Sequence, residues 1–413
     1  MEAVAADTQS ESPISRVRVL FVIGALYATQ YIPLLFAMMA LPIVLRQEGQ
    51  SATTIGLVQL AALPYLLKFL WAPLVDRWAP GRQHYSSWIG SLSIIHAAFI
   101  VVLAFFDPAG SVTPLIIVLV FAIFAISTQD VAVDALAIRL LSPEDRPVGA
   151  AFQAGGGYIG ALIGGGLFLT AYGWFGWTNA LLIQAAIFAI PVLSLLLIME
   201  PPRIPDAVRF GWRDAIGFFR LAGNGRWTII LMTFRLPLII TLLPMQISLV
   251  DAGMGPEEFG LWMGIFAMTA AAVASVVIGP MMRGLPRRDA LIVAGLATLL
   301  AAASILALSY GAPLALRWGL IIAWGTLGLS DVVLFAGAMD RARPAMPGFD
   351  FSVQLTLTFI LHRFAEPLIG MVIDNAGPRP VFMGSIAVAV IAIGIVVLAF
   401  GRRKGELPEP API

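Results

Sequence analysis

Long apolar stretches recur along the whole chain, with only short polar breaks between them. About 20 apolar residues in helical form cross the hydrocarbon core of a bilayer, and a helix satisfies its backbone hydrogen bonds within its own segment. We therefore predict an all-α integral membrane protein with twelve transmembrane helices. The twelve stretches, each 19 to 28 residues long, are 18–45, 54–75, 88–106, 113–138, 149–172, 177–199, 227–250, 259–282, 290–310, 317–339, 351–373 and 380–400.

The composition excludes several classes of protein. Hydrophobic residues make up 59% of the 413-residue chain and charged residues only 12%, whereas a soluble domain has about 45–50% and about 25%. A secreted protein, a nucleic-acid binder and a cytosolic enzyme are all unexpected on these grounds. There is no cysteine, so disulfides, thiolate metal sites and cysteine nucleophiles are excluded. The polar first 17 residues do not have the form of a cleavable signal peptide.

The basic residues indicate the orientation, because Lys and Arg gather in cytoplasmic loops. With the N-terminus inside, 19 of the 25 basic residues fall in cytoplasmic segments. Three fall in outer loops and three within spans. This separation favours twelve spans with both termini in the cytoplasm. The outer three are Arg46, Arg317 and Arg379, and the buried three are Lys68, Arg235 and Arg363.

Repeated spacings predict two pseudo-symmetric six-helix halves, which is the plan of many transporters. The interval Pro33 to Gly49 is 16 residues, as is Pro237 to Gly253, and the intervals Asp130 to Gln153 and Asp331 to Gln354 are both 23 residues. The predicted parts are a tail (1–17), an N-terminal half (18–199), a linker (200–226), a C-terminal half (227–400) and a second tail (401–413). The linker sequence VRFGWRDAIGFFR is compatible with an interfacial helix or with a solvated tether.

Ionisable residues inside spans are the main candidates for function, since each costs about 2.5–3.5 kcal/mol at the centre of a membrane helix. Burial and a neighbouring cation act in opposite directions on a carboxyl group, so such groups can exchange protons near neutral pH. Asp130 and Asp134 lie one helical turn apart, and Asp331 occupies the repeat-matched position of Asp130. The candidates for proton coupling are Asp130, Asp134, Asp331, His362 and Glu366.

A second group of polar residues is suited to a substrate cavity. Arg235 and Arg363 are permanently charged and fit an anionic substrate group or a fixed ion pair. Lys68 and Asp134 lie near the cytoplasmic end, so a purely structural pair is an equal alternative. Gln30 and Tyr31 precede a proline and either line the cavity or pack. The cavity candidates are Gln30, Tyr31, Lys68, Gln129, Arg235 and Arg363.

Two further patterns concern helix packing and the lack of cofactor-binding or catalytic motifs. Gly156, Gly160 and Gly164 recur every four residues in the fifth span, which favours close helix contact, and the small-residue face at 260–274 is a plausible partner. No metal-ligand spacing, Walker motif or catalytic triad is present, so we expect no metal, cofactor, catalytic residue or nucleic-acid partner. A polytopic enzyme or receptor is a remaining alternative, although the few buried charges are scattered over different helices.

Two motifs resemble one family. LKFLWAPLVDR (67–77) and TQDVAVDALA (128–137) are similar to the muropeptide permease and acetyl-CoA transporter group of the major facilitator superfamily. The stretch 27–60 looks most like bacterial siderophore importers related to rhizobactin and pyochelin uptake. Asp76, Arg77 and Arg82 resemble the superfamily's cytoplasmic gate between helices 2 and 3, with Ala72 at the place of a usual glycine.

The resemblance implies the major facilitator fold, with helices 1, 4, 7 and 10 around a central cavity and alternating access. It implies proton-driven import of an iron–siderophore across the bacterial inner membrane, by a monomer in the bilayer. A muropeptide or another small solute is the alternative substrate.

Overall fold

A computed structural model describes most of the chain. The structure describes residues 13–50, 58, 60–81, 83–110, 112–201, 217–221 and 223–400. Within these ranges the side chains of 13–15, 191, 256–257, 313, 362–364 and 366–367 are not described. The linker residues 202–216, Arg82 and the two tail segments 1–12 and 401–413 lie outside the described residues. So do the side chains of His362, Arg363 and Glu366, although their backbone is helical.

The N-terminal half consists of helices only, within the residues that the structure describes. Gly176, with φ of 75°, separates the fifth span from the sixth inside α9. The elements are α1 (Pro13–Leu35), η1 (Phe36–Ala40), α2 (Leu41–Gln47), η2 (Leu60–Ala62), α4 (Leu63–Leu67), η3 (Lys68–Leu70), α5 (Ala72–Arg77), α6 (His84–Leu103), α7 (Val112–Leu140), α8 (Arg146–Leu162), η4 (Ile163–Leu167), α9 (Phe168–Ile187), α10 (Ala189–Ser194) and η5 (Leu195–Leu197).

The C-terminal half follows the same helical plan. Its first span is interrupted at Arg235, between two helices. The elements are α12 (Asn224–Thr233), α13 (Leu236–Asp251), α14 (Pro256–Gly260), η6 (Leu261–Ala267), α15 (Met268–Met282), α16 (Arg287–Leu308), η7 (Pro313–Ala315), α17 (Leu316–Arg341), α18 (Pro347–Ala376) and α19 (Arg379–Phe400).

The predicted all-helical membrane architecture is confirmed. Among the described residues, nine helical runs are long and apolar enough to cross a membrane. One of them, Arg146–Leu197, contains 52 residues and includes both the fifth and the sixth predicted spans. The second span holds only a shorter apolar run, Leu60–Leu70. The eleventh predicted span corresponds to the helix α18, which has 30 residues. At 1.5 Å per residue this helix is about 45 Å long.

The second span is a broken helix. Three-residue 3₁₀ segments lie on both sides of α4, and Trp71 separates η3 from α5. Short 3₁₀ pieces within a span often mark a functional hinge. The hydroxyl of Thr356 on α18 lies 3.2 Å from the carbonyl oxygen of Leu66, and it shares its hydrogen between this oxygen and the Ser352 carbonyl at 3.0 Å. A side chain of the C-terminal half therefore supports the broken helix of the N-terminal half.

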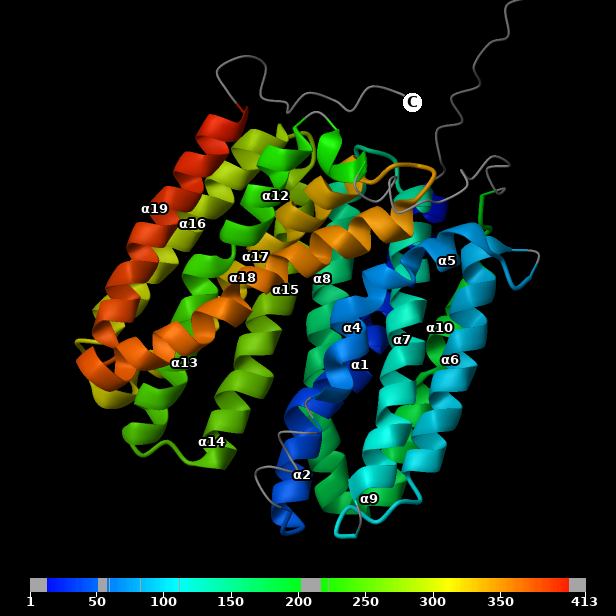
Figure 1. The fold of residues 1–413 in the computed structure, drawn as a ribbon, viewed down its shortest axis with the longest axis horizontal. Helices are drawn as coiled ribbons and strands as arrows, with labels where there is room; N and C mark the ends of the chain where they lie inside the picture. The colour runs from blue at the N-terminus through cyan, green and yellow to red at the C-terminus, as the bar shows by residue number, and fades with distance from the viewer. Residues whose placement is uncertain are drawn as a thin grey trace, which may run out of the picture.

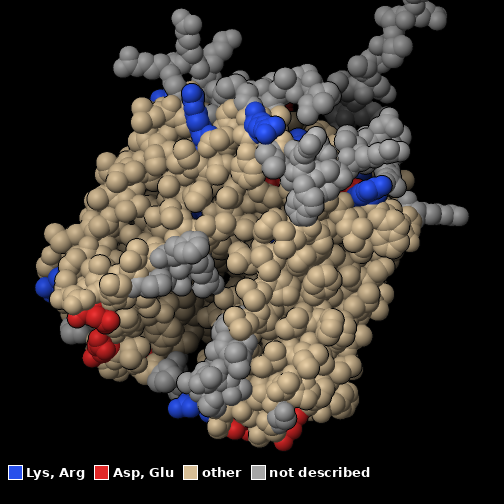
Figure 2. Space-filling model, viewed as in Figure 1, with Lys and Arg blue, Asp and Glu red and all other residues tan. Residues whose placement is uncertain are grey.

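The two halves lie side by side and meet along several helices. In Figure 1 the blue and cyan helices are on the right and most of the yellow to red helices are on the left, with α8 and α15 between them. α8 packs against α15 and α17, and α18 packs against α5 and α7. Figure 2 shows a broad uncharged flank, with charged side chains near its two ends, and a hollow between the halves towards the lower end.

The glycine stripe of the fifth span packs closely, as predicted, but the suggested partner was wrong for these three residues. A Cβ atom at Gly160 would lie 2.1 Å from the carbonyl oxygen of Ala28, and one at Gly164 would lie 2.0 Å from that of Ile32. Gly156 similarly faces α1. The opposite face of the helix, at Gly155, contacts Val276 of α15. Helical spacing predicted the stripe but could not choose between two neighbours that both have small residues.

Candidate functional site

The N-terminal half contains a buried cluster of one cation and two carboxyl groups. Lys68 Nζ contacts the Asp130 carboxylate directly and lies 3.3 Å from Asp134 Oδ2. The exposed fractions are 1% for Lys68, 1% for Asp130 and 0% for Asp134. The two acids share a face of α7 because they are four residues apart. The 3₁₀ segment η3 carries Lys68 towards that face.

Tyr27 of α1 completes this cluster. Its hydroxyl donates to Asp134 Oδ1 over 2.6 Å, and the side chain is fully buried. Within the described residues, Lys68 is the one cation paired with these acids. The cluster therefore carries a formal charge of −1 when both acids are ionised. Sequence reasoning did not single out Tyr27.

The C-terminal half contains a second, simpler cluster. Arg235 Nε lies 2.9 Å from Asp331 Oδ1, and the guanidinium lies over the ring of Phe359 at 5.2 Å. The interruption between α12 and α13 places Arg235 beside α17, which carries Asp331. One arginine and one aspartate give a neutral pair. The exposed fractions are 7% for Arg235 and 5% for Asp331.

Tyr158 joins this second cluster to the other half. It lies on α8 in the N-terminal half, and its hydroxyl donates to Asp331 Oδ2 over 2.7 Å. The Tyr158 ring meets Trp324 edge-on at 6.1 Å. Sequence reasoning treated the surrounding glycine-rich span as packing and missed Tyr158. The available signal was a single tyrosine among small residues.

Aromatic rings lie between the two clusters. Tyr31 and Tyr65 meet edge-on at 6.4 Å, and Lys68 Nζ lies 5.0 Å from the centre of the Tyr65 ring. Tyr31 also packs against Gly157, next to Tyr158. The predicted cavity residues Tyr31, Lys68 and Arg235 are thus placed near the boundary between the halves.

Two of the remaining three predicted cavity residues, Gln30 and Gln129, are placed differently. Gln30 is fully buried, and both polar atoms of its amide are unpartnered within the described residues. Gln129 donates to Ser93 Oγ over 2.6 Å and therefore faces α6. His362, Arg363 and Glu366 can be placed only on the helix α18, because their side chains are not described.

Asp76, at the predicted gate, connects the halves at one end of the molecule. Its carboxylate accepts from the backbone N–H of Gly348 over 3.1 Å and from that of Phe349 over 2.8 Å, at the beginning of α18. The Tyr85 hydroxyl also donates to it, over 3.0 Å. Burial raises the pKa of Asp76 from 3.8 to about 7, although these three hydrogen bonds act in the opposite direction. Arg77 is exposed beside it.

Ion pairs reinforce the same end. Asp340 of α17 accepts from Arg287 Nε over 2.6 Å and from Arg146 of the N-terminal half over 2.9 Å. Asp145 Oδ1 lies 2.7 Å from Arg16 and 3.2 Å from Arg283 of the C-terminal half. The two shared carboxylates therefore each contact both halves. These contacts hold the two halves together at this end of the molecule.

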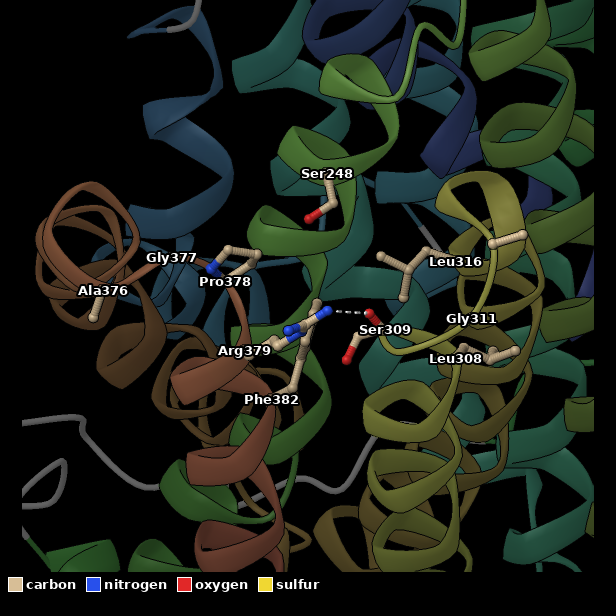
Figure 3. A pocket seen from close by; sticks show the side chains of 11 residues that line it. Ser248, Leu308, Ser309, Gly311, Leu316, Ala376, Gly377, Pro378, Arg379 and Phe382 are labelled. Atoms are coloured by element: carbon tan, nitrogen blue, oxygen red, sulfur yellow. Dashed lines mark hydrogen bonds between the residues drawn. The ribbon is translucent and has the colours of Figure 1, made fainter.

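A pocket of about 400 Å³ lies near the opposite end, within the C-terminal half. Figure 3 shows Arg379 lying across it from the beginning of α19, next to Ser248 and Ser309. The guanidinium donates to the Ser309 carbonyl over 3.4 Å and lies 4.5 Å from the centre of the Tyr310 ring. The pocket is separate from the predicted site residues.

Comparisons with known proteins agree with this arrangement. Residues 19–361 match the family model of the Major Facilitator Superfamily. The chain is 26% identical to the anhydromuropeptide permease of Escherichia coli K12 over 380 residues, covering 87% of this chain and 74% of that protein. It is 29% identical to the Rickettsia felis protein AmpG 4 over 199 residues, 46% of this chain and 47% of that one.

The fold also matches a solved structure. The human organic anion transporter MFSD10 (TETRAN) superposes with a TM-score of 0.70, covering 94% of this chain and 100% of that one. The sequence identity is 15%, so this likeness supports the fold alone.

Proposed function

This chain belongs to the Major Facilitator Superfamily, and on that premise we propose that it is a proton-coupled permease for an anhydromuropeptide-like solute. It is a multi-pass membrane protein and a secondary transporter rather than an enzyme. The proposed direction is import across the bacterial inner membrane, with both termini in the cytoplasm. The distribution of basic residues supports this orientation.

The main support for proton coupling is the buried cluster of Lys68, Asp130 and Asp134. An uncompensated charge in a buried site costs several kcal/mol. One ammonium neutralises one carboxylate, so the second acid is most stable when it holds a proton. Opening the site to water removes this cost and releases the proton. A site whose preferred charge changes with access to water is what a proton-coupled cycle requires.

Alternating access is supported by where the halves touch. Asp76, Asp340 and Asp145 close the predicted cytoplasmic end through contacts between the halves. The hollow in Figure 2 opens towards the other end. On this proposal, the conformation is that of an outward-facing permease. Movement to the inward-facing state must break the contacts at the cytoplasmic end and the bond from Tyr158 to Asp331.

The substrate class is taken from the relatives and the chemistry of the site together. The Escherichia coli relative is named for anhydromuropeptides, which supports this class over iron–siderophores. The resemblance of residues 27–60 to siderophore importers remains the basis of the second candidate. Arg235 would meet an anionic group of either substrate, and the rings of Tyr31 and Tyr65 would pack on its flat parts.

Uptake into proteoliposomes tests the coupling. Purified protein should accumulate labelled anhydromuropeptide when the interior is alkaline, and the accumulation should collapse with a protonophore. Asp374→Asn is the matched control for Asp130→Asn, because it makes the same change at an aspartate that is exposed at the far end of α18. Uptake that is unaffected by the gradient would exclude proton coupling.

The substrate is tested in cells that lack the gene. Loss of anhydromuropeptide recovery, restored by the intact gene, supports the proposed class. Failure to grow on a single ferric siderophore as iron source, with normal muropeptide recovery, would instead establish the second candidate.

A further inference from the structure

A polar cluster lies inside the N-terminal half, on the side of α7 that faces α6. Ser93 and His96 of α6, Gln129 of α7 and Gln184 of α9 are each 3% exposed or less. Gln129 Nε2 donates to Ser93 Oγ over 2.6 Å. The His96 ring packs on Phe188 at 4.3 Å, one turn beyond Gln184 on the same stretch of chain. None of these groups has a part in the coupling cluster or the gate.

The hydrogen bonds fix the orientation of Gln129. The Ser93 hydroxyl donates to the Ile89 carbonyl over 2.7 Å. A hydroxyl has a single hydrogen, so Ser93 accepts from Gln129, and the nitrogen of that amide must be the atom that faces it. The oxygen Oε1 of Gln129 is then left as an acceptor, and it has no partner in the described part of the chain.

The same reasoning assigns the hydrogens of His96. Its Nδ1 lies 2.8 Å from the Ala122 carbonyl oxygen. A carbonyl only accepts, so Nδ1 carries the hydrogen, and Nε2 of the neutral ring is an acceptor. Nε2 is unpartnered within the described residues. Among the same residues, no Asp, Glu, Lys or Arg pairs with any member of the cluster.

Two acceptors cannot satisfy each other, so their partner must donate two hydrogen bonds. The amide of Gln184 is also without a partner at both polar atoms in the described chain, and it can donate from its nitrogen. Buried polar groups are nearly always paired, and a buried water typically makes about three hydrogen bonds. We propose that this cluster binds one water molecule, which donates to His96 Nε2 and Gln129 Oε1 and accepts from Gln184 Nε2.

The bound water joins three helices. It connects α6, α7 and α9 at one depth of the membrane and holds α7 in one rotation about its axis. Asp130 follows Gln129 directly in the sequence, on another face of α7. By restraining the rotation of α7, the water site also restrains the direction in which Asp130 points.

Nitrogen-15 NMR of the full-length protein in bilayers tests the assignment. The chain has three histidines, so the His96 signals are identified by their loss in His96→Gln. The expected spectrum at pH 7 is a neutral ring with the hydrogen on Nδ1, a hydrogen-bonded Nε2 and a correlation from Nε2 to a water proton. An imidazolium, a hydrogen on Nε2 or an Nε2 without the water correlation would overturn the proposal.

Gln184→Met separates the water from a direct contact with Gln184. The water correlation at Nε2 should persist in this variant, because the water still donates to His96. If the Nε2 signal instead moves to that of an unbonded nitrogen, Gln184 was the donor and the proposal fails.

Thermal unfolding gives an independent measurement. Gln129→Leu and Gln184→Leu should each lower Tm, whereas the variant that also carries His96→Leu should lose less than the sum of the three single changes, because no polar group is left unpaired. Asn179→Leu, at an exposed amide of α9, serves as the control and should leave Tm unchanged. Additive losses would show that the three side chains share no partner.

Discussion

The two buried ion clusters differ in charge and in connection. Lys68, Asp130 and Asp134 lie in one half and contain one carboxyl group more than their cation can neutralise. Arg235 and Asp331 form a neutral pair in the other half. The first cluster receives its tyrosine from its own half, whereas the second receives Tyr158 from the opposite half.

If the protein works as proposed, this difference assigns a different role to each cluster. A cluster with an extra acid can exchange a proton without disturbing the contact between the halves. A neutral pair that is bonded across the boundary changes when the halves move or when an anion approaches Arg235. We therefore expect changes in the first cluster to affect driving force, and changes in the second to affect substrate affinity and conformation.

Asp130→Asn gives the largest expected effect. The remaining Lys68–Asp134 pair is neutral without an exchangeable proton, so uphill accumulation should be abolished while substrate exchange continues. A pH difference of one unit supplies about 1.4 kcal/mol per proton, which is about a tenfold accumulation. Proteoliposome uptake with and without the gradient measures the loss. Full accumulation by this variant would remove Asp130 from the coupling mechanism.

Arg235→Gln examines the second cluster. It leaves Asp331 buried without a cation, which costs about 3–5 kcal/mol of folding free energy, and we expect a lower Tm and a higher KM. The double variant Arg235→Gln/Asp331→Asn should regain stability but retain the raised KM. A normal KM in the stable double variant would contradict a substrate contact at Arg235.

Asp76 gives a pH effect that neither buried cluster explains. Its pKa is about 7 when the gate is closed and should return towards 3.8 when the gate opens to water. The closed gate binds the proton more tightly, so acid favours closure. Between about pH 4 and pH 7 closure should weaken by about 1.4 kcal/mol per unit as pH rises, and change little above that range.

Spin labels can follow this gate, because the chain has no native cysteine. Ser142→Cys and Leu285→Cys place labels at exposed positions at the gated end, one in each half. The distance between them should lengthen as pH rises from 5 to 7. In Asp76→Asn the pH dependence should disappear, and a pH dependence that survives would assign it to another group.

Tyr158→Phe and Tyr27→Phe form a matched pair. Each removes one hydroxyl that donates to a buried aspartate, and such a bond is worth about 1.5–3 kcal/mol. Loss of the Tyr158 bond should shift the spin-label distances towards the inward-open state, since this bond joins the halves. Loss of the Tyr27 bond should leave the distances unchanged. Equal shifts would remove the proposed distinction between the clusters.

Glycine substitutions give the smallest expected effect and compare packing within each half. Cβ atoms would lie 2.1 Å from the Ala28 carbonyl at Gly160 and 2.4 Å from the Ala271 carbonyl at Gly328. Each change to alanine should cost about 1–3 kcal/mol and lower Tm. Gly173→Ala, at a position with open space, is the control. A normal Tm for Gly160→Ala would contradict the tight α1–α8 contact.

The sequence predicted the charged side chains of both clusters because a buried charge is conspicuous in an apolar helix. Asp130, Lys68 and Asp331 were all identified in this way. Tyr27 and Tyr158 were not, since tyrosine is ordinary in membrane helices and its role depends on the partner it reaches. The direction of Gln129 was equally hidden, because helix rotation is decided by packing against α6 rather than by the periodicity of α7.

The break in the second span ties solvent entry to movement. An unbroken membrane helix satisfies its own backbone throughout a transport cycle, but at the break in the second span the Leu66 carbonyl shares the Thr356 hydroxyl of the other half with the Ser352 carbonyl. When the halves separate there, water can take the place of the hydroxyl at this oxygen. Separation of the halves at this point therefore goes together with wetting of the broken helix.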